Sequence, residues 1–308
     1  MRLLDGLSHS SQSDAYVRSV EEMTLMLLNN LTATHISAVD DLLQNEDEDM
    51  RGFYLSKLQT LFERLGAKAA NDSDDDEEEE KKKKKVPTAP TRDIRRWILQ
   101  ILLNLTRSKD GQQQLLEDED WCQTLEECLQ SPNARHRWIA AQCYRNCATA
   151  TLNPFVPLLL KSNAVRVCME RLSRDGSIEP DASIQVCLAE VLCGILASEE
   201  GIAYLESINA RQLLEKAVTA SMFYHHNTDR NDTVHGSADR VEVVSEKESE
   251  NNKSEKDNIS NSNHTTLVKD GSVVILARDT CEFIEKYILP YLDEIVNAYV
   301  APGSDELD

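Results

Sequence analysis

The chain has 308 residues, 41% of them hydrophobic, and a formal net charge of −21. Enough apolar residues are present for a packed core, which excludes a wholly disordered chain, and the negative charge would repel phosphate and argues against nucleic-acid binding. No stretch approaches the roughly 20 continuous apolar residues that span a bilayer. Asp5 interrupts the short apolar N-terminus, which disfavours a secretory signal. We therefore expect a soluble intracellular protein that does not bind membranes.

We predict N-terminal armadillo-like repeats in residues 1–70, which include the apolar stretch MLLNNLT beginning at Met26. Residues 71–92 have no apolar face and hold runs of acids and lysines, so we predict a charged disordered linker there. Within it, five lysines ending at Lys85 and followed by Val86 and Pro87 resemble a short nuclear-import signal. The acids just before the lysines offset their charge, and we favour a solvated charge run.

Residues 93–225 predict the central and C-terminal repeats. Apolar residues recur at helical spacing on one side of the first long helix: Trp97, Ile98, Ile101, Leu102 and Leu105. A charged turn and a second, shorter helix follow. Pro132 then interrupts the pattern before the next long helix, because proline cannot continue a helix. The region therefore reads as long helices separated by shorter ones.

The helices repeat along the chain. Three long helices can be overlaid on an asparagine, Asn30, Asn104 and Asn146, and a fourth places Gly194 there. Gly111 and Gly201 each follow seven residues later in their own copies. The later copies are 42 and 48 residues apart, close to the period of armadillo and HEAT arrays. We therefore predict an all-α, armadillo/HEAT-like α-solenoid with two disordered inserts, in which stacked units share one core.

The second predicted insert covers residues 226–270, which are rich in Asn, Ser and charged residues. Residues 271–308 are predicted to hold a closing helix and a tail. SVVILA, residues 272–277, is expected to open that helix. Its apolar positions include Phe283, Ile284, Tyr287, Ile288 and Tyr291, so we expect the helix to pack on the last repeat and close the core.

No catalytic or cofactor-binding motif occurs in the sequence, so we predict a non-enzymatic protein without a cofactor. Most of the eight cysteines lie in apolar helical stretches and are expected to pack as small hydrophobic residues. Cys143 and Cys147 share a helix face, but no second pair at zinc-like spacing follows, so core packing is favoured over a metal site. The tandem His225-His226 is expected at the surface.

The asparagines allow two interpretations. Asn30, Asn104 and Asn146 could line a concave groove and hydrogen-bond an extended peptide, or each could bond to a neighbouring repeat. The sequence does not decide between these.

Several stretches resemble the HGH proteins, eukaryotic armadillo-like co-chaperones associated with the folding of translation elongation factor 2. RHRWIAAQCYRNCAT matches a family segment at Arg145, Asn146 and Cys147, and the stretch that starts with Glu179, Pro180 and Asp181 follows the most specific family pattern. The resemblance covers most of residues 12–218. It implies a cytoplasmic, monomeric co-chaperone that binds elongation factor 2 and general chaperones, including the chaperonin. It also adds Arg145 to Asn30, Asn104 and Asn146 as a candidate partner-binding residue.

The sequence also departs from this family. Gln185 and Ile202 stand where the family has arginines. Family members carry further helical repeats before the position of Leu3, so we expect an uncapped apolar repeat face at the N-terminal side.

Two other functions remain as alternatives. A nuclear-transport-like peptide adaptor fits the period and the acidity, but such grooves pair a tryptophan with an asparagine four residues later. Here those positions hold Met26, Gln100 and Gln142. A scaffold subunit of a protein complex is the third possibility, and it rests on fold analogy alone.

Overall fold

The computed structural model describes residues 14–78, 93–149, 154–234 and 274–292. Every regular element within these ranges is a helix, which confirms the predicted all-α class. The helices are α2 (Asp14–Thr34), α3 (Ile36–Leu43), α4 (Phe53–Glu78), α5 (Arg95–Leu105), α6 (Lys109–Glu117), α7 (Glu119–Gln130), α8 (Ala134–Ala148), α9 (Val156–Lys161), α10 (Ala164–Ser173), α11 (Ala182–Ile195), α12 (Glu199–Ser207), α13 (Ala210–Val234) and α14 (Arg278–Tyr287).

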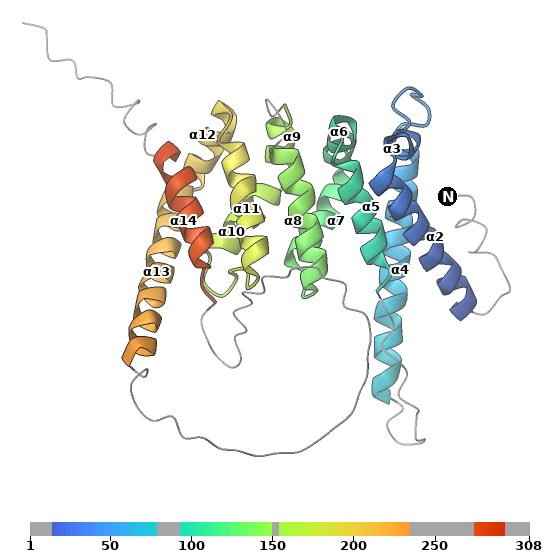
Figure 1. Ribbon diagram of the computed structural model, residues 1–308. Helices are drawn as coiled ribbons and strands as arrows, with labels where there is room; N and C mark the ends of the chain where they lie inside the picture. Colours follow the sequence, from blue (N-terminus) through green and yellow to red (C-terminus); the bar gives the residue numbers. More distant parts are fainter. Residues whose placement is uncertain (1–13, 79–92, 150–153, 235–273, 293–308) are drawn as a thin grey trace, which may run out of the picture.

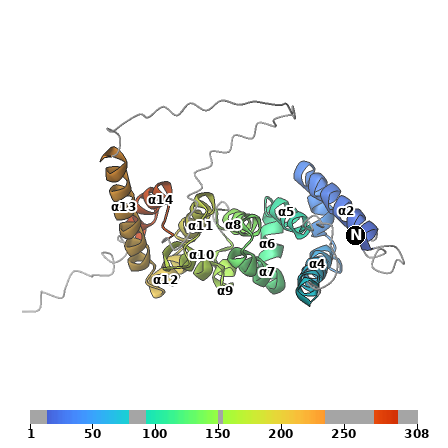
Figure 2. The same ribbon diagram turned by 90° about the horizontal axis from the view of Figure 1, so that it is seen from below.

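The helices form three rows in chain order (Figures 1 and 2). In the first row, which we call the front row, each of α2, α5, α8, α11 and α14 packs against the next. A second row behind it contains α7, α10 and α13, with α4 beside α5. The short helices α3, α6, α9 and α12 follow one another along one end of these rows.

One apolar core runs between the rows, from Leu25 in α2 to Leu292 shortly after α14. Its removal from water is the main force that holds the helices together. Trp121 of α7 is fully buried, and its indole N–H donates to the Leu55 carbonyl at 3.0 Å. Its ring meets that of Phe62 edge-on, with 6.0 Å between ring centroids. This tryptophan thereby joins α4 to α7.

The two overlaid glycines occupy equivalent turns. Ser108 caps α6 by accepting the Gly111 N–H at 3.1 Å, and Ser198 caps α12 by accepting the Gly201 N–H at 3.0 Å. An added Cβ on Gly111 would overlap the carbonyl oxygen of Leu105, just as one on Gly201 would overlap that of Ile195. The short helix crosses so close to the end of the preceding long helix that only glycine fits.

Two helices extend past the predicted boundaries. α4 continues to Glu78, into the linker predicted from residue 71, and α13 continues to Val234, into the insert predicted from residue 226. A helix needs only its own backbone hydrogen bonds to continue, whereas the predicted boundaries lie where the apolar face ends. The rest of both predicted inserts lies outside the described residues.

The start of the last helix also differs from the prediction. Residues 274–277 are not helical, and α14 begins at Arg278. Side chains of α11 and α13 bond to the backbone of this segment, so it has no need of helical hydrogen bonds. α14 packs on α11 and α13, and its Cys281 and Ile284 are buried. Tyr287 and Tyr291, expected on the apolar face, are exposed.

Candidate functional site

Asn104 and Asn146 bond to the neighbouring helix of the front row. The Asn104 side-chain amide donates to Thr32 Oγ1 at 3.0 Å and to the Asn29 carbonyl at 3.1 Å. The Asn146 amide donates to Thr106 Oγ1 at 3.0 Å. Each threonine lies two residues after an overlaid asparagine, so the same contact occurs twice. Of the two interpretations of the asparagines, the structure supports the bond between neighbouring helices for this pair.

In the fourth copy, a close contact between helix backbones takes the place of this hydrogen bond. It holds the overlaid position in α11, and an added Cβ would overlap the carbonyl oxygen of Ala148 in α8. Ala148 lies two residues after Asn146, the position that threonine holds in α2 and α5. Glycine and alanine therefore bring α11 and α8 together where an asparagine and a threonine hold the other pairs.

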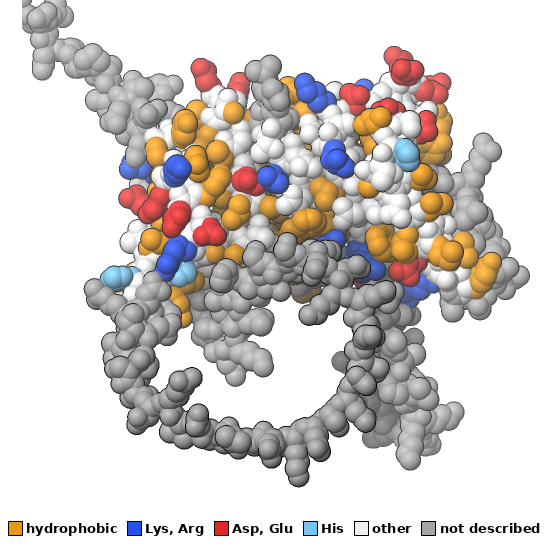
Figure 3. Space-filling view, viewed as in Figure 1, with side chains coloured by type: hydrophobic (Ala, Val, Ile, Leu, Met, Phe, Trp, Pro, Cys, Tyr) orange, Lys and Arg blue, Asp and Glu red, His pale blue; other side chains and the backbone are white. Residues whose placement is uncertain are grey.

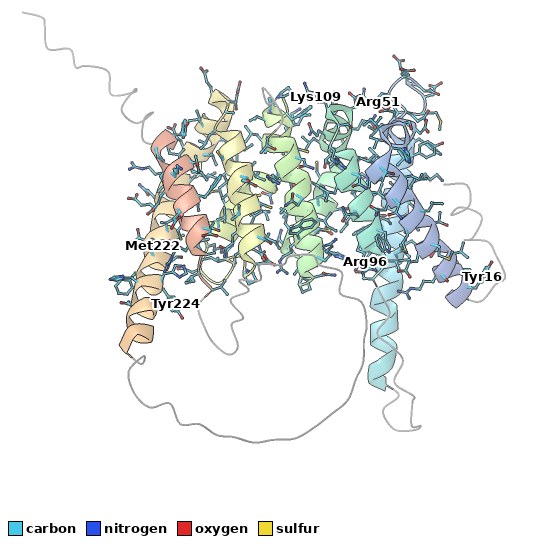
Figure 4. All side chains as sticks on the ribbon, viewed as in Figure 1. Tyr16, Arg51, Arg96, Lys109, Met222 and Tyr224 are labelled. Atoms are coloured by element: carbon cyan, nitrogen blue, oxygen red, sulfur yellow. The ribbon has the colours of Figure 1, made fainter. Side chains whose placement is uncertain are left out.

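Asn30 has a different environment, because it lies exposed on the side of α2 that faces away from α5. We call that side the outer α2 face. It contains nine positions on one side of the helix, and none holds a charged residue: Tyr16, Ser19, Val20, Met23, Met26, Leu27, Asn30, Leu31 and Thr34. Met23 is 67% exposed and Leu27 61%. Figure 4 labels Tyr16 at one end of this face. The result is an exposed apolar surface at the end of the front row.

Arg145 lies on a second exposed surface, formed by α5 and α8. We call it the arginine–tryptophan face and define it by Arg96, Trp97, Arg107, Arg135, Trp138 and Arg145. Neither α5 nor α8 contains an aspartate or a glutamate. In the middle of Figure 3, basic side chains lie among apolar ones, whereas acidic side chains gather mainly toward the edges. Figure 4 labels Arg96 near the start of α5.

Two guanidinium groups on this face are held over indole rings. The central carbon of Arg96 lies 4.7 Å from the Trp97 ring centroid, and that of Arg135 lies 5.0 Å from the Trp138 ring centroid. Such stacking fixes the cation while leaving its N–H groups available to acceptors. Arg145 itself pairs with Glu190 of α11, with Nε 2.5 Å from Oε2.

A buried ion-pair cluster joins α8, α10 and α11. The Glu179 carboxylate is fully buried and accepts from Nε of Arg137 at 2.9 Å and from Nη2 at 3.0 Å. Arg171 of α10 also donates to this carboxylate, and the Asp181 N–H does so at 3.1 Å. Sequence reasoning noticed Glu179 and Asp181 through the family resemblance but missed the arginines, because nothing in their local spacing marks them as partners of residue 179.

Gln185 of α11 fixes the segment before α14 through side-chain hydrogen bonds. Its amide donates to the Glu179 carbonyl at 2.6 Å and to the Ile275 carbonyl at 3.1 Å, and it accepts from the Ala277 N–H at 2.7 Å. Ser221 and His225 of α13 bond to the backbone of Leu276 on the other side. His225 thus has a structural role that could not be predicted from the tandem His225-His226 sequence, and only His226 of the pair is exposed.

The thiols are suited to packing and poorly suited to chemistry. Cys143 and Cys147 are fully buried, as expected for core residues. Cys122 borders a hollow between α6, α7 and α9, but burial, with smaller contributions from Glu126 and other acids nearby, raises the pKa of its thiol to about 12. A thiol with that pKa is a poor nucleophile at neutral pH. In the described part of the chain, no group of three or more His, Cys, Asp or Glu side chains is placed to hold a metal ion.

No described helix combines the length and the apolar character needed to cross a membrane. No family model and no curated protein matches the chain. A solved crystal structure of an engineered protein from a structural genomics consortium is similar to 72% of this chain and 73% of its own, with 13% identity and a TM-score of 0.46. A likeness of this size carries no argument about fold or function.

Proposed function

We propose that the chain is an armadillo/HEAT-like α-solenoid that acts as a non-enzymatic, monomeric co-chaperone in the cytoplasm. Its client would be a partly folded protein, translation elongation factor 2, held together with general chaperones and the chaperonin. The recurring contacts in the front row support the solenoid: Asn104 with Thr32, Asn146 with Thr106, and Gly194 with Ala148. The identity of the client rests on the sequence resemblance alone.

The outer α2 face is the observation that carries the chaperone proposal. Exposed apolar surfaces of this kind mark interaction sites, and a folding intermediate exposes apolar segments that such a surface would cover. Met23 and Met26 contribute flexible, polarizable side chains, which adapt to clients of irregular shape. Asn30, one turn before the C-terminal end of the face, offers an amide that can bond to the client backbone.

The experiment is a pull-down of elongation factor 2 and chaperonin subunits with the full chain at low salt. The variant Met23→Gln/Leu27→Gln makes the outer α2 face polar, and we expect it to lose the captured elongation factor. The matched control Leu213→Gln/Phe223→Gln removes two exposed apolar side chains from α13 instead, and it should retain the client. Circular dichroism should show the same helix content in all three proteins.

Failure of the unaltered chain to capture elongation factor 2 or chaperonin subunits would contradict the client assignment. Equal capture by the two double variants would contradict the role of the outer α2 face.

A peptide-binding adaptor of the nuclear-transport type is less well supported. The tryptophans of the front row, Trp97 and Trp138, lie among arginines on the arginine–tryptophan face, which would repel the basic peptides that carry import signals.

A further inference from the structure

The arginine–tryptophan face is a local excess of positive charge on an acidic protein. α5 and α8 together hold five arginines and no acids, although the chain as a whole carries a net charge of −21. Two of the five are engaged elsewhere, since Arg137 is buried against Glu179 and Arg95 pairs with Asp93 at 2.9 Å. The remaining three and Arg107, just after α5, lie on the exposed face.

These four arginines differ in their partners. Arg145 and Arg96 each have an acid on a flanking helix, Glu190 at 2.5 Å and Glu22 at 3.9 Å. Arg107 and Arg135 hydrogen-bond only to neutral oxygens within the described structure: the Ala33 carbonyl at 3.4 Å and Gln100 Oε1 at 3.5 Å. No carboxylate among the described residues therefore neutralises the positive charge of Arg107 or Arg135.

Along the helix axes, the arginine–tryptophan face is about as long as a short extended peptide. α5 and α8 run in the same direction, because Arg135 at the start of α8 meets Gln100 in the middle of α5, and Asn146 near the end of α8 meets Thr106 just past the end of α5. From Arg96 to Arg107 a helix rises roughly 16 Å, the length of about five extended residues. Arginines lie toward both ends of this length, and the two indole rings lie beside Arg96 and Arg135, toward the starts of the two helices.

We propose that the arginine–tryptophan face binds an acidic segment of a partner protein. Carboxylates of the segment would accept bidentate bonds from Arg107 and Arg135, the geometry for which guanidinium is best suited. Apolar side chains between the acids would contact Trp97 and Trp138. This surface is separate from the outer α2 face, so the inference does not depend on the identity of the co-chaperone client.

A protein segment fits this face better than a nucleic acid does. Glu22 and Glu190 flank the face on α2 and α11, and the rest of the chain is strongly acidic. A polyanion of many phosphates would extend past the face and meet these acids, whereas a segment of about five residues ends before them. Long-range repulsion therefore disfavours the longer polymer.

The test is fluorescence anisotropy of a labelled five-residue peptide, Glu-Trp-Glu-Leu-Glu, titrated with the full chain at low salt. Arg107→Gln/Arg135→Gln should weaken binding about fivefold to tenfold, since exposed ion pairs contribute modestly each. Lys161→Gln/Arg174→Gln removes the same amount of positive charge at the end of α9 and just after α10, and it should leave binding within about twofold. Glu190→Gln should tighten binding about twofold to threefold, because it frees Arg145 from its internal carboxylate.

Three results would overturn the proposal. The first is that the two charge-matched double variants weaken peptide binding equally, which would mean that net charge alone determines the affinity. The second is an oligouridylate that binds as tightly as the peptide and loses affinity in the same variant, which would make the face a nucleic-acid site. The third is peptide binding that occurs only after the seven acids at positions 74–80 are replaced by serine, which would make the chain's own acids the occupant. If the arginine variant fails to fold, the gain in affinity of Glu190→Gln decides the matter alone.

Discussion

Replacing Glu179 by alanine tests whether the buried ion-pair cluster holds three helices together. The carboxylate is fully buried, and both arginines that bond to it are largely buried, with side chains 8% and 16% exposed for Arg137 and Arg171. In Glu179→Ala both guanidinium groups keep their charge and lose their counterion. The Asp181 N–H at the start of α11 loses its acceptor as well.

The expected loss of stability is large because an unpaired charge is left in the core. Breaking a buried pair by removing one partner costs about 3–5 kcal/mol, against about 0.5 kcal/mol or less for an exposed pair. Glu170 provides the exposed control: it pairs with Arg166 at 3.2 Å on the surface of α10. We therefore expect Glu179→Ala to lower the free energy of unfolding by several kcal/mol and Glu170→Ala to change it little.

Urea denaturation followed by circular dichroism at 222 nm measures both effects, with tryptophan fluorescence as a second probe. A double-mutant cycle with Arg137→Ala isolates the pair, and the double variant should cost clearly less than the sum of the single ones. The reasoning is wrong if Glu179→Ala costs no more than Glu170→Ala, or if the effects of Glu179→Ala and Arg137→Ala simply add.

Three further predictions concern single side chains. Gly194→Asn, which restores the asparagine of the other copies, should destabilise the fold by about 1–3 kcal/mol in urea, because its Cβ would overlap the Ala148 backbone; an unchanged midpoint would contradict the close contact. At pH 8 a thiol reagent should modify half-buried Cys193 first and the seven buried cysteines only after unfolding, and Cys193→Ser should remove the early phase. Burial raises the pKa of Asp93, but bonds from His136 and Arg95 outweigh it and hold that pKa well below 3.8. The ionised Asp93 therefore stabilises the fold fully above pH ~4, and this stabilisation is lost progressively as the pH falls below that value. The free energy of unfolding, measured against pH, should accordingly fall less in acid for Asp93→Asn than for the unaltered chain.

Helical periodicity was sufficient to predict the class of fold. The spacing of Ile98, Ile101, Leu102 and Leu105 places all four in the core, where each is at most 2% exposed. The equivalence of Gly111 and Gly201 was also visible, because a glycine required by close approach to the preceding helix recurs at the same offset. Both features depend on residues near one another in the chain.

Features that depend on distant residues could not be predicted in the same way. Nothing around Glu179 in the sequence indicates Arg137, 42 residues earlier, as its partner. The non-helical segment at 274–277 is held by Gln185, Ser221 and His225, each of which bonds to a residue at least 51 positions later in the chain. Val274 and Ile275 are β-branched and have only moderate helix propensity, so the tertiary hydrogen bonds decide the conformation of this segment.

The asparagines show why residue type and register alone do not define a site. Asn30 and Asn104 hold the same overlaid position, yet only Asn104 has a helix of the described structure on its outward side, and its amide is used to bond Thr32. On α2 the corresponding side is exposed, so the residue that joins helices in one copy is available to a partner in another. A partner helix could pack on the outer α2 face in the way that α2 packs on α5. It would then place a hydroxyl or carbonyl group within reach of the Asn30 amide, as α2 places Thr32 within reach of Asn104. Asn30→Ala should then weaken client capture without loss of stability, because the Asn30 amide lies on an exposed surface. Asn104→Ala should destabilise the fold, because the Asn104 amide bonds to α2 across a helix interface.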